Sequence, residues 1–166
     1  LFNSTTSASI KGYYVANSYN MFSFTAQLLP SANPNGSIRC YMDPMTRSYI
    51  NTGENPPVPE SNWGLSRFHS LLRRTVEWTD ANYPLPDGMN VDKDNDGTVD
   101  NAVFVVSGPA VSGTAFWPHA SGIGGANAYV NTTTGKKLIN SYILLCSDWL
   151  DVGVITHELN HSLGEP

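Results

Sequence analysis

Apolar residues recur every three to four positions in two stretches of the chain, which is the spacing of an amphipathic helix. Residues 64–83 form the first stretch, and its apolar positions are Leu65, Phe68, Leu72 and Val76. Arg73 and Glu77 lie four residues apart, so they can pair on the outer face of this helix. Residues 151–163 form the second stretch, and Asp151 can cap its start.

The first sixty residues show weaker patterns. A short helix is predicted within residues 7–20, because Ser and Thr side chains at its start can cap it. Residues 21–29 predict a half-buried strand, because alternate positions are apolar: Phe22, Phe24, Ala26 and Leu28. Residues 37–42 predict a shorter strand after a turn that contains proline and glycine. The Pro-rich stretch 43–62 predicts an exposed loop.

Further strands are predicted in the second half of the chain. The continuous apolar run 102–106 predicts a strand that is buried on both faces. Residues 137–146 predict another strand, and a short one is expected near the end of the Gly-rich stretch 113–130. Helices and strands in this order predict a mixed fold, which we assign to the α+β class. The length of 166 residues suits one domain, 1–166.

Charge and composition exclude several partners. The formal net charge is -5 and the nine Lys and Arg are scattered, so nucleic acid is a poor partner. No apolar run approaches the ~20 residues of a transmembrane helix. Charged residues are only 14 % and are replaced by Asn, Ser, Thr and Gly, a composition that we associate with secreted proteins. Cys40 and Cys146 can form one disulfide or remain two separate buried thiols.

His157, Glu158 and His161 form the pattern His-Glu-x-x-His inside the predicted helix 151–163. Residues four apart share one helix face, so both imidazoles can bind one Zn²⁺. Zinc lowers the pKa of a bound water to ~7, and Glu158 can then take the proton of that water as general base. The pattern predicts metal-assisted peptide hydrolysis. The alternative is an ordinary helix with two surface histidines.

Gly164 extends this pattern, because a helix often ends at a glycine in the left-handed conformation. A chain that turns there can bring a third ligand back to the metal. His-Glu-x-x-His-x-x-Gly-x-x followed by His or Asp is the pattern of the metzincin superfamily. In this numbering the third ligand is the residue after Pro166. We therefore expect the sequence to be an N-terminal subdomain that stops just after its active-site helix.

An acidic loop precedes the strand predicted at 102–106. Its carboxylates alternate along the chain, at Asp92, Asp94, Asp96 and Asp100. Calcium binds several such oxygen atoms, and Gly97 permits a tight turn between them. The start of the loop resembles an EF-hand, but Val103 stands where the bidentate glutamate of that motif belongs. A partial calcium loop is one prediction. An acidic turn whose carboxylates accept hydrogen bonds from backbone amides is the other.

Two further histidines lie outside these motifs. His119 follows Trp117 and Pro118, and these residues are candidates to contact substrate or to orient a zinc ligand. A loop histidine that packs against Trp117 is the alternative, and we favour it. His69 lies in the helix predicted at 64–83, and we interpret it as a packing or surface residue.

Four stretches of the chain together resemble the immune inhibitor A family of secreted bacterial metallopeptidases. They read SIKGYYVANSYNMFSF, VDKDNDGTVDNAVFVVSG, FWPHASGI and GVITHELNHSLGEP. The resemblance implies a zincin-like catalytic subdomain, secreted or attached to the cell surface, with a twisted mixed sheet, a backing helix and an active-site helix. It implies a zinc endopeptidase that acts on protein or peptide, with His157 and His161 as zinc ligands and Glu158 as the base. The chain has Asn160 and Glu165 where the family tends to have glycine and a hydrophobic residue.

Two rival functions remain open at the level of the sequence. One is a calcium-stabilised extracellular binding or adhesion module with an inactive or incomplete peptidase site. The other is a zinc hydrolase that acts on an amide other than a peptide.

Overall fold

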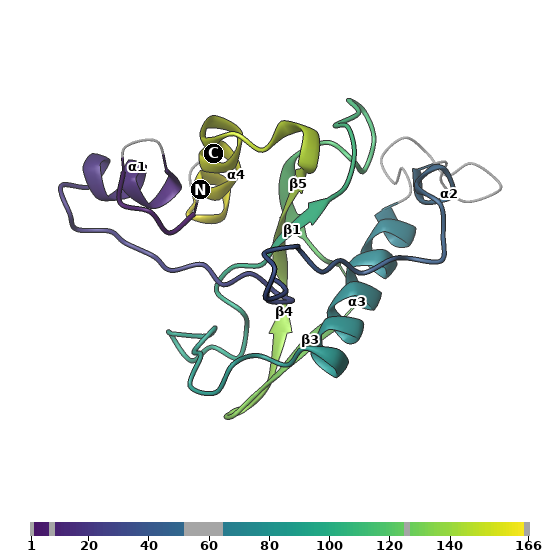
Figure 1. Ribbon diagram of the computed structural model, residues 1–166, viewed down its shortest axis with the longest axis horizontal. Helices are drawn as coiled ribbons and strands as arrows, with labels where there is room; N and C mark the ends of the chain where they lie inside the picture. Colours follow the sequence, from purple (N-terminus) through teal and green to yellow (C-terminus); the bar gives the residue numbers. More distant parts are fainter. Residues whose placement is uncertain (1, 7–8, 52–64, 125–126, 165–166) are drawn as a thin grey trace.

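The computed structural model describes residues 2–6, 9–51, 65–124 and 127–164. It has an α+β fold in which helices pack on a small mixed sheet (Figure 1). The helices are α1 (Ile10–Asn17), α2 (Arg47–Asn51), α3 (Leu65–Asn82), the 3-10 turn η2 (Ser147–Trp149) and α4 (Val152–Ser162). The strands are β1 (Val103–Val106), β2 (His119–Gly122), β3 (Ala128–Thr132), β4 (Gly135–Ile139) and β5 (Ser141–Cys146).

The main sheet has the strand order β1-β5-β2. Strand β1 runs parallel to β5, and β2 runs antiparallel to it, so the sheet is mixed as predicted. A separate antiparallel hairpin, β3-β4, packs against α3 through β3. In Figure 1, α3 lies on one side of the main sheet and α4 on the other.

The central strand β5 is buried on both faces. Tyr142 and Leu144 point to the side of α3 and join a core that includes Phe68. Ile143 and Leu145 point to the other side and pack against α4 and α1. Since successive side chains of a strand point to opposite faces, this single strand contributes to two separate hydrophobic cores.

The three longer helices confirm the predictions made from periodicity and capping. The face of α3 that carries Phe68 is buried, and Arg73 pairs with Glu77 at 2.8 Å on its exposed face. In α1, the side chain of Ser9 accepts a hydrogen bond from the amide of Gly12 and so caps the helix. These interactions are local in the sequence, which explains why the sequence reveals them.

The strands predicted at 21–29 and 37–42 are wrong. Both segments are irregular and make no strand ladder. Phe24 packs beside Tyr14 and Phe22 lies edge-on to the same ring, so these aromatic residues contact α1 rather than a neighbouring strand. The alternation of apolar residues therefore reflects contact with a helix. Among the described residues, no neighbouring strand pairs with the backbone of these segments.

Three other predictions need correction. Strand β1 forms, but it lies at an edge of the sheet and Val105 is 48 % exposed, so it is not buried on both faces. The single strand predicted at 137–146 is two strands in different sheets, which meet at Asn140. The loop predicted at 43–62 contains the short helix α2, and residues 52–62 lie outside the described part. Strand β2 was not predicted.

Both cysteines are free thiols, so the disulfide alternative is wrong. Cys146 is buried and donates to the carbonyl of Phe116 at 3.3 Å. Cys40 is exposed, contrary to the alternative of two buried thiols. Burial raises the pKa of the Cys146 thiol.

Replacing Ile143 with Ala tests the role of β5 as the shared core strand. Ile143 is 0 % exposed, and its removal leaves a cavity between the sheet and α4. We expect a loss of about 2–5 kcal/mol in the free energy of unfolding, measured by denaturant titration. Val105→Ala in exposed β1 is the matched control and should cost clearly less. Equal losses in the two variants would contradict the two-sided burial of β5.

Candidate metal centre

Helix α4 presents the His-Glu-x-x-His pattern because its opposite face is held by the core. Asp151 caps the helix, and its carboxylate accepts from the amide of Val154 at 2.9 Å. Ile155 is completely buried against β5 and α1. His157 and His161 are therefore left exposed, one turn apart on the outer surface of the helix.

The geometry of the two histidines fits a shared metal ion. Their Nε2 atoms lie 3.2 Å apart, and the ring centroids lie 4.7 Å apart with an interplanar angle of 86°. Two imidazole nitrogens that bind one tetrahedral Zn²⁺ at ~2.0–2.1 Å are about 3.3–3.4 Å apart. The Nε2 atoms of His157 and His161 therefore already have nearly the spacing of two zinc ligands.

Glu158 lies beside this pair but is only 6 % exposed. It lines a pocket of about 280 Å³ together with His157, Gly153 and Val154 of α4. The opposite wall contains Trp117, Pro118 and Trp149. The two indole rings meet edge-to-face at 5.0 Å. A carboxylate and a histidine thus open into a cavity whose remaining wall is mostly apolar.

The segment after α4 turns as the glycine predicts. Gly164 has φ 94, and its amide donates to the carbonyl of His161 at 3.2 Å. The expected third ligand follows Pro166 and thus lies beyond the described residues, as does Glu165. Asn160 has a structural role. Its side-chain oxygen accepts from the hydroxyl of Tyr14 in α1 at 2.6 Å.

The acidic loop brings together three of its four predicted ligands. Carboxylate oxygens of Asp92, Asp94 and Asp100 all lie within 4.8 Å of one another. This is the one place in the described part of the chain where three side chains of metal-binding type gather. Asp96 is not in the cluster, because its carboxylate accepts from the amide and hydroxyl of Thr98, both at 2.7 Å.

A lysine from another element already neutralises part of this loop. The ammonium of Lys137 in β4 lies 2.6 Å from Oδ2 of Asp92, which is 1 % exposed. The amides of Asp96 and Gly97 donate to the same carboxylate at 3.0 and 3.1 Å. The hydrogen bond from Lys137 lowers the pKa of Asp92; burial opposes this shift, and the amide of Gly97 adds to it. The sequence did not reveal Lys137, since 45 residues separate it from Asp92.

His119 lies on the α3 side of the sheet, where both of its ring nitrogens have partners. Nδ1 lies 2.6 Å from the carbonyl oxygen of Trp117, and Nε2 lies 2.9 Å from the hydroxyl of Tyr142. The same hydroxyl lies 3.3 Å from Nε2 of His69. The hydrogen bonds of His119 therefore connect β2 with β5 and, through Tyr142, with α3. The neighbours Trp117 and Pro118 line the pocket beside His157, but His119 does not.

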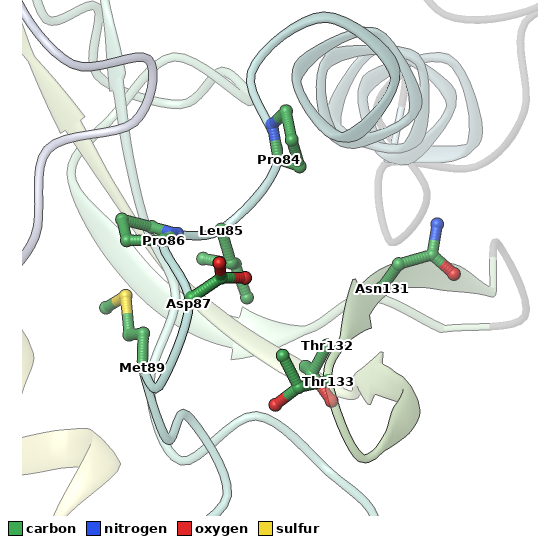
Figure 2. A pocket seen from close by; sticks show the side chains of 8 residues that line it. All are labelled: Pro84, Leu85, Pro86, Asp87, Met89, Asn131, Thr132 and Thr133. Atoms are coloured by element: carbon green, nitrogen blue, oxygen red, sulfur yellow. The ribbon is translucent and has the colours of Figure 1, made fainter.

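A second pocket, of about 210 Å³, lies at the far end of the β3-β4 hairpin (Figure 2). Its walls are the loop after α3 and the hairpin turn, with residues Pro84, Leu85, Pro86, Asp87, Met89, Asn131, Thr132 and Thr133. Asp80 of α3 accepts hydrogen bonds from the backbone and side-chain amides of Asn131, which fixes the hairpin to the helix. Asp87 is the one ionisable residue in this wall.

Comparisons with known proteins return no family: no family model, curated protein or solved structure matches the chain. None of the helices in the described ranges combines the length and the apolar character that a membrane span requires.

Replacing Lys137 with Met tests how the acidic loop is neutralised. A carboxylate whose pKa is lowered in the folded state stabilises the fold above its unfolded pKa of ~3.9. That contribution is lost as the pH falls through the lower, folded pKa. Without Lys137, Asp92 stays buried beside Asp94 and Asp100. We therefore expect lower stability at neutral pH and an acid transition that begins at higher pH, measured by denaturant titration across pH 3–8.

Lys136→Met is the matched control, because Lys136 is the exposed neighbour on the same strand. We expect Lys136→Met to show the same acid transition as the unmodified protein. An unchanged profile in Lys137→Met would show that the backbone amides alone stabilise the buried carboxylate.

Proposed function

We propose that the protein is a zinc-dependent endopeptidase of the metzincin type, similar to the immune inhibitor A family. The observation that carries this proposal is the 3.2 Å separation of the Nε2 atoms of His157 and His161, with Glu158 between them in the sequence and buried at the pocket beside them. Few helices present two imidazoles and a carboxylate in this way by chance, because each residue type must occupy one turn in the right order.

The proposed roles follow from the donor atoms. His157 and His161 hold the zinc ion through Nε2, which leaves Nδ1 of each ring to carry the proton. When bound, zinc acidifies a water molecule and polarises the carbonyl of the substrate. Glu158 accepts the proton of that water and delivers it to the leaving amine. The low exposure of Glu158 suits a base that must take its proton from one bound water rather than from bulk solvent.

A peptide is the substrate class that the surroundings of the site favour. Strand β2 is an edge strand of the main sheet and packs against α4. An extended peptide can hydrogen-bond to such an edge. The pocket lined by Trp117 and Val154 can then receive an apolar side chain of that peptide. These features support a peptide over a small amide, which needs no strand edge.

The proposed architecture is a zincin-like catalytic fold, secreted or attached to a bacterial cell surface. Three features support it: the sheet is mixed, α3 backs one face of it, and α4, the proposed active-site helix, covers the other face and follows the central strand after the η2 turn.

Replacing Glu158 with Gln in the complete protein is the direct test. Gln keeps the shape of the side chain but cannot accept the proton, so we expect a fall in kcat of about 10²–10⁴-fold. Zinc content should stay unchanged. Cleavage of quenched fluorescent peptides measures the fall in kcat, and atomic emission measures the zinc content. Glu77→Gln, at the exposed pair with Arg73, is the matched control. Full activity of Glu158→Gln would remove this residue from the role of base.

The acidic loop favours a second candidate function, a calcium-stabilised extracellular binding module. Three carboxylates within 4.8 Å of one another can bind calcium, although Lys137 already contacts one of them. Metal analysis of the purified complete protein separates the candidates. We expect one zinc ion per chain, lost in His157→Ala, and cleavage that a chelator abolishes. Calcium without zinc, and no cleavage, would favour the binding module.

A further inference from the structure

A chain of hydrogen-bonded polar side chains runs through the α3 side of the sheet, with Tyr142 buried and His69 and His119 half-buried. Tyr142 of β5 is 1 % exposed and packs against the rings of Phe68 and Phe104. Its hydroxyl lies between two imidazoles, 2.9 Å from Nε2 of His119 and 3.3 Å from Nε2 of His69. Buried polar groups require such partners, and here the partners come from β2 and from α3.

The direction of each hydrogen bond follows from the carbonyl at one end. The Trp117 carbonyl can only accept, so Nδ1 of His119 carries a proton and donates to it. Nε2 of neutral His119 is then unprotonated and accepts from the hydroxyl of Tyr142. The oxygen of that hydroxyl in turn accepts from Nε2 of His69. The donors run from His69 through Tyr142 and His119 to Trp117.

This chain ends at the wall of the candidate active site. Trp117 and Pro118 line the pocket that also contains His157 and Glu158. The indole of Trp117 contacts that of Trp149, which lies just before α4. His119 therefore holds the backbone carbonyl of Trp117 in the pocket wall, although His119 itself does not line the pocket.

We propose that His69, Tyr142 and His119 are positioning residues that hold the Trp117 wall of the pocket, and that this chain binds one additional proton but resists a second. The functional part of the inference depends on the proposed function, in that the pocket is taken as the substrate site. One proton is tolerated because the chain can reverse. Protonated His119 donates from Nε2 to Tyr142, whose hydroxyl then donates to His69. Two protons place two cationic N–H groups against one hydroxyl oxygen in the core, where like charges repel strongly.

The surroundings of the chain supply little compensating charge. Ser121, the cross-strand neighbour of Tyr142, does not titrate. The Cys146 thiol of β5 donates to the backbone carbonyl of Phe116. The guanidinium of Arg47 in α2 lies over the ring of Phe116, 4.2 Å from its centroid. Within the described ranges, no carboxylate forms a hydrogen bond with either imidazole. Burial, followed by the neighbouring His119, lowers the pKa of His69.

The test is a pH titration of the histidine rings by ¹⁵N NMR, with chelator present and no substrate. The chain has four histidines, and His69→Gln and His119→Gln assign the two that matter. We expect the two rings to charge in separate steps, as coupled sites do. Charging of both rings in one step near pH 6.5, like independent histidines, would overturn the proposal.

The wall is monitored in the same samples through 5-fluorotryptophan. We expect the ¹⁹F resonance of Trp117, assigned with Trp117→Phe, to keep its position through the first step and to shift with the second. Tyr142→Phe removes only the hydroxyl and should shift this resonance at neutral pH, whereas Tyr129→Phe, at an exposed tyrosine of β3, should not. A Trp117 resonance that shifts neither with the second protonation step nor in Tyr142→Phe would refute the positioning role.

If Tyr142→Phe fails to fold, the titration of the unmodified protein decides the question alone. Neither readout needs zinc or turnover. A protein without peptidase activity would therefore refute the proposed function and leave the histidine chain to be judged separately.

Discussion

The alternation of side chains along β5 is the constraint on which the rest of the molecule depends. This strand has neighbours on both edges and a helix layer on each face, so every one of its side chains must fit a specific environment. A shift by one residue would exchange Tyr142 with Ile143 and place the larger phenol in the space that Ile143 fills against Ile155. The register therefore decides where α4 docks and which surface of α4 faces solvent.

The helices could be predicted from the sequence because their determinants are local. The apolar stripe around Phe68 and the cap at Asp151 each lie within one or two turns of the chain. A strand forms only beside another strand that pairs with it. The sequence around Phe24 has the pattern of a strand, but it cannot show that the fold provides no pairing strand there. The exposed position of β1 is likewise a property of the sheet order, which no stretch of four residues encodes.

The candidate site likewise has features that could be predicted from the sequence and features that could not. The positions of His157 and His161 follow from the helical repeat, so their proximity could be predicted from their spacing in the sequence. The contact of Lys137 with Asp92 and the two imidazoles around Tyr142 could not, because each joins elements that only the fold brings together. The acidic loop shows the consequence clearly. Its pattern indicates a bound cation, and the fold supplies one from a lysine side chain.

The contact between α1 and α4 has a consequence for biosynthesis. The hydroxyl of Tyr14 reaches the carbonyl of Thr156 as well as Asn160, and Ile10 and Ile155 share one core. More than 140 residues separate these partners. A ribosome that adds 5–20 residues per second therefore leaves the apolar side of α1 without its final cover for about 7–30 seconds. During that interval a chaperone, or a neighbouring nascent chain, competes for the same surface.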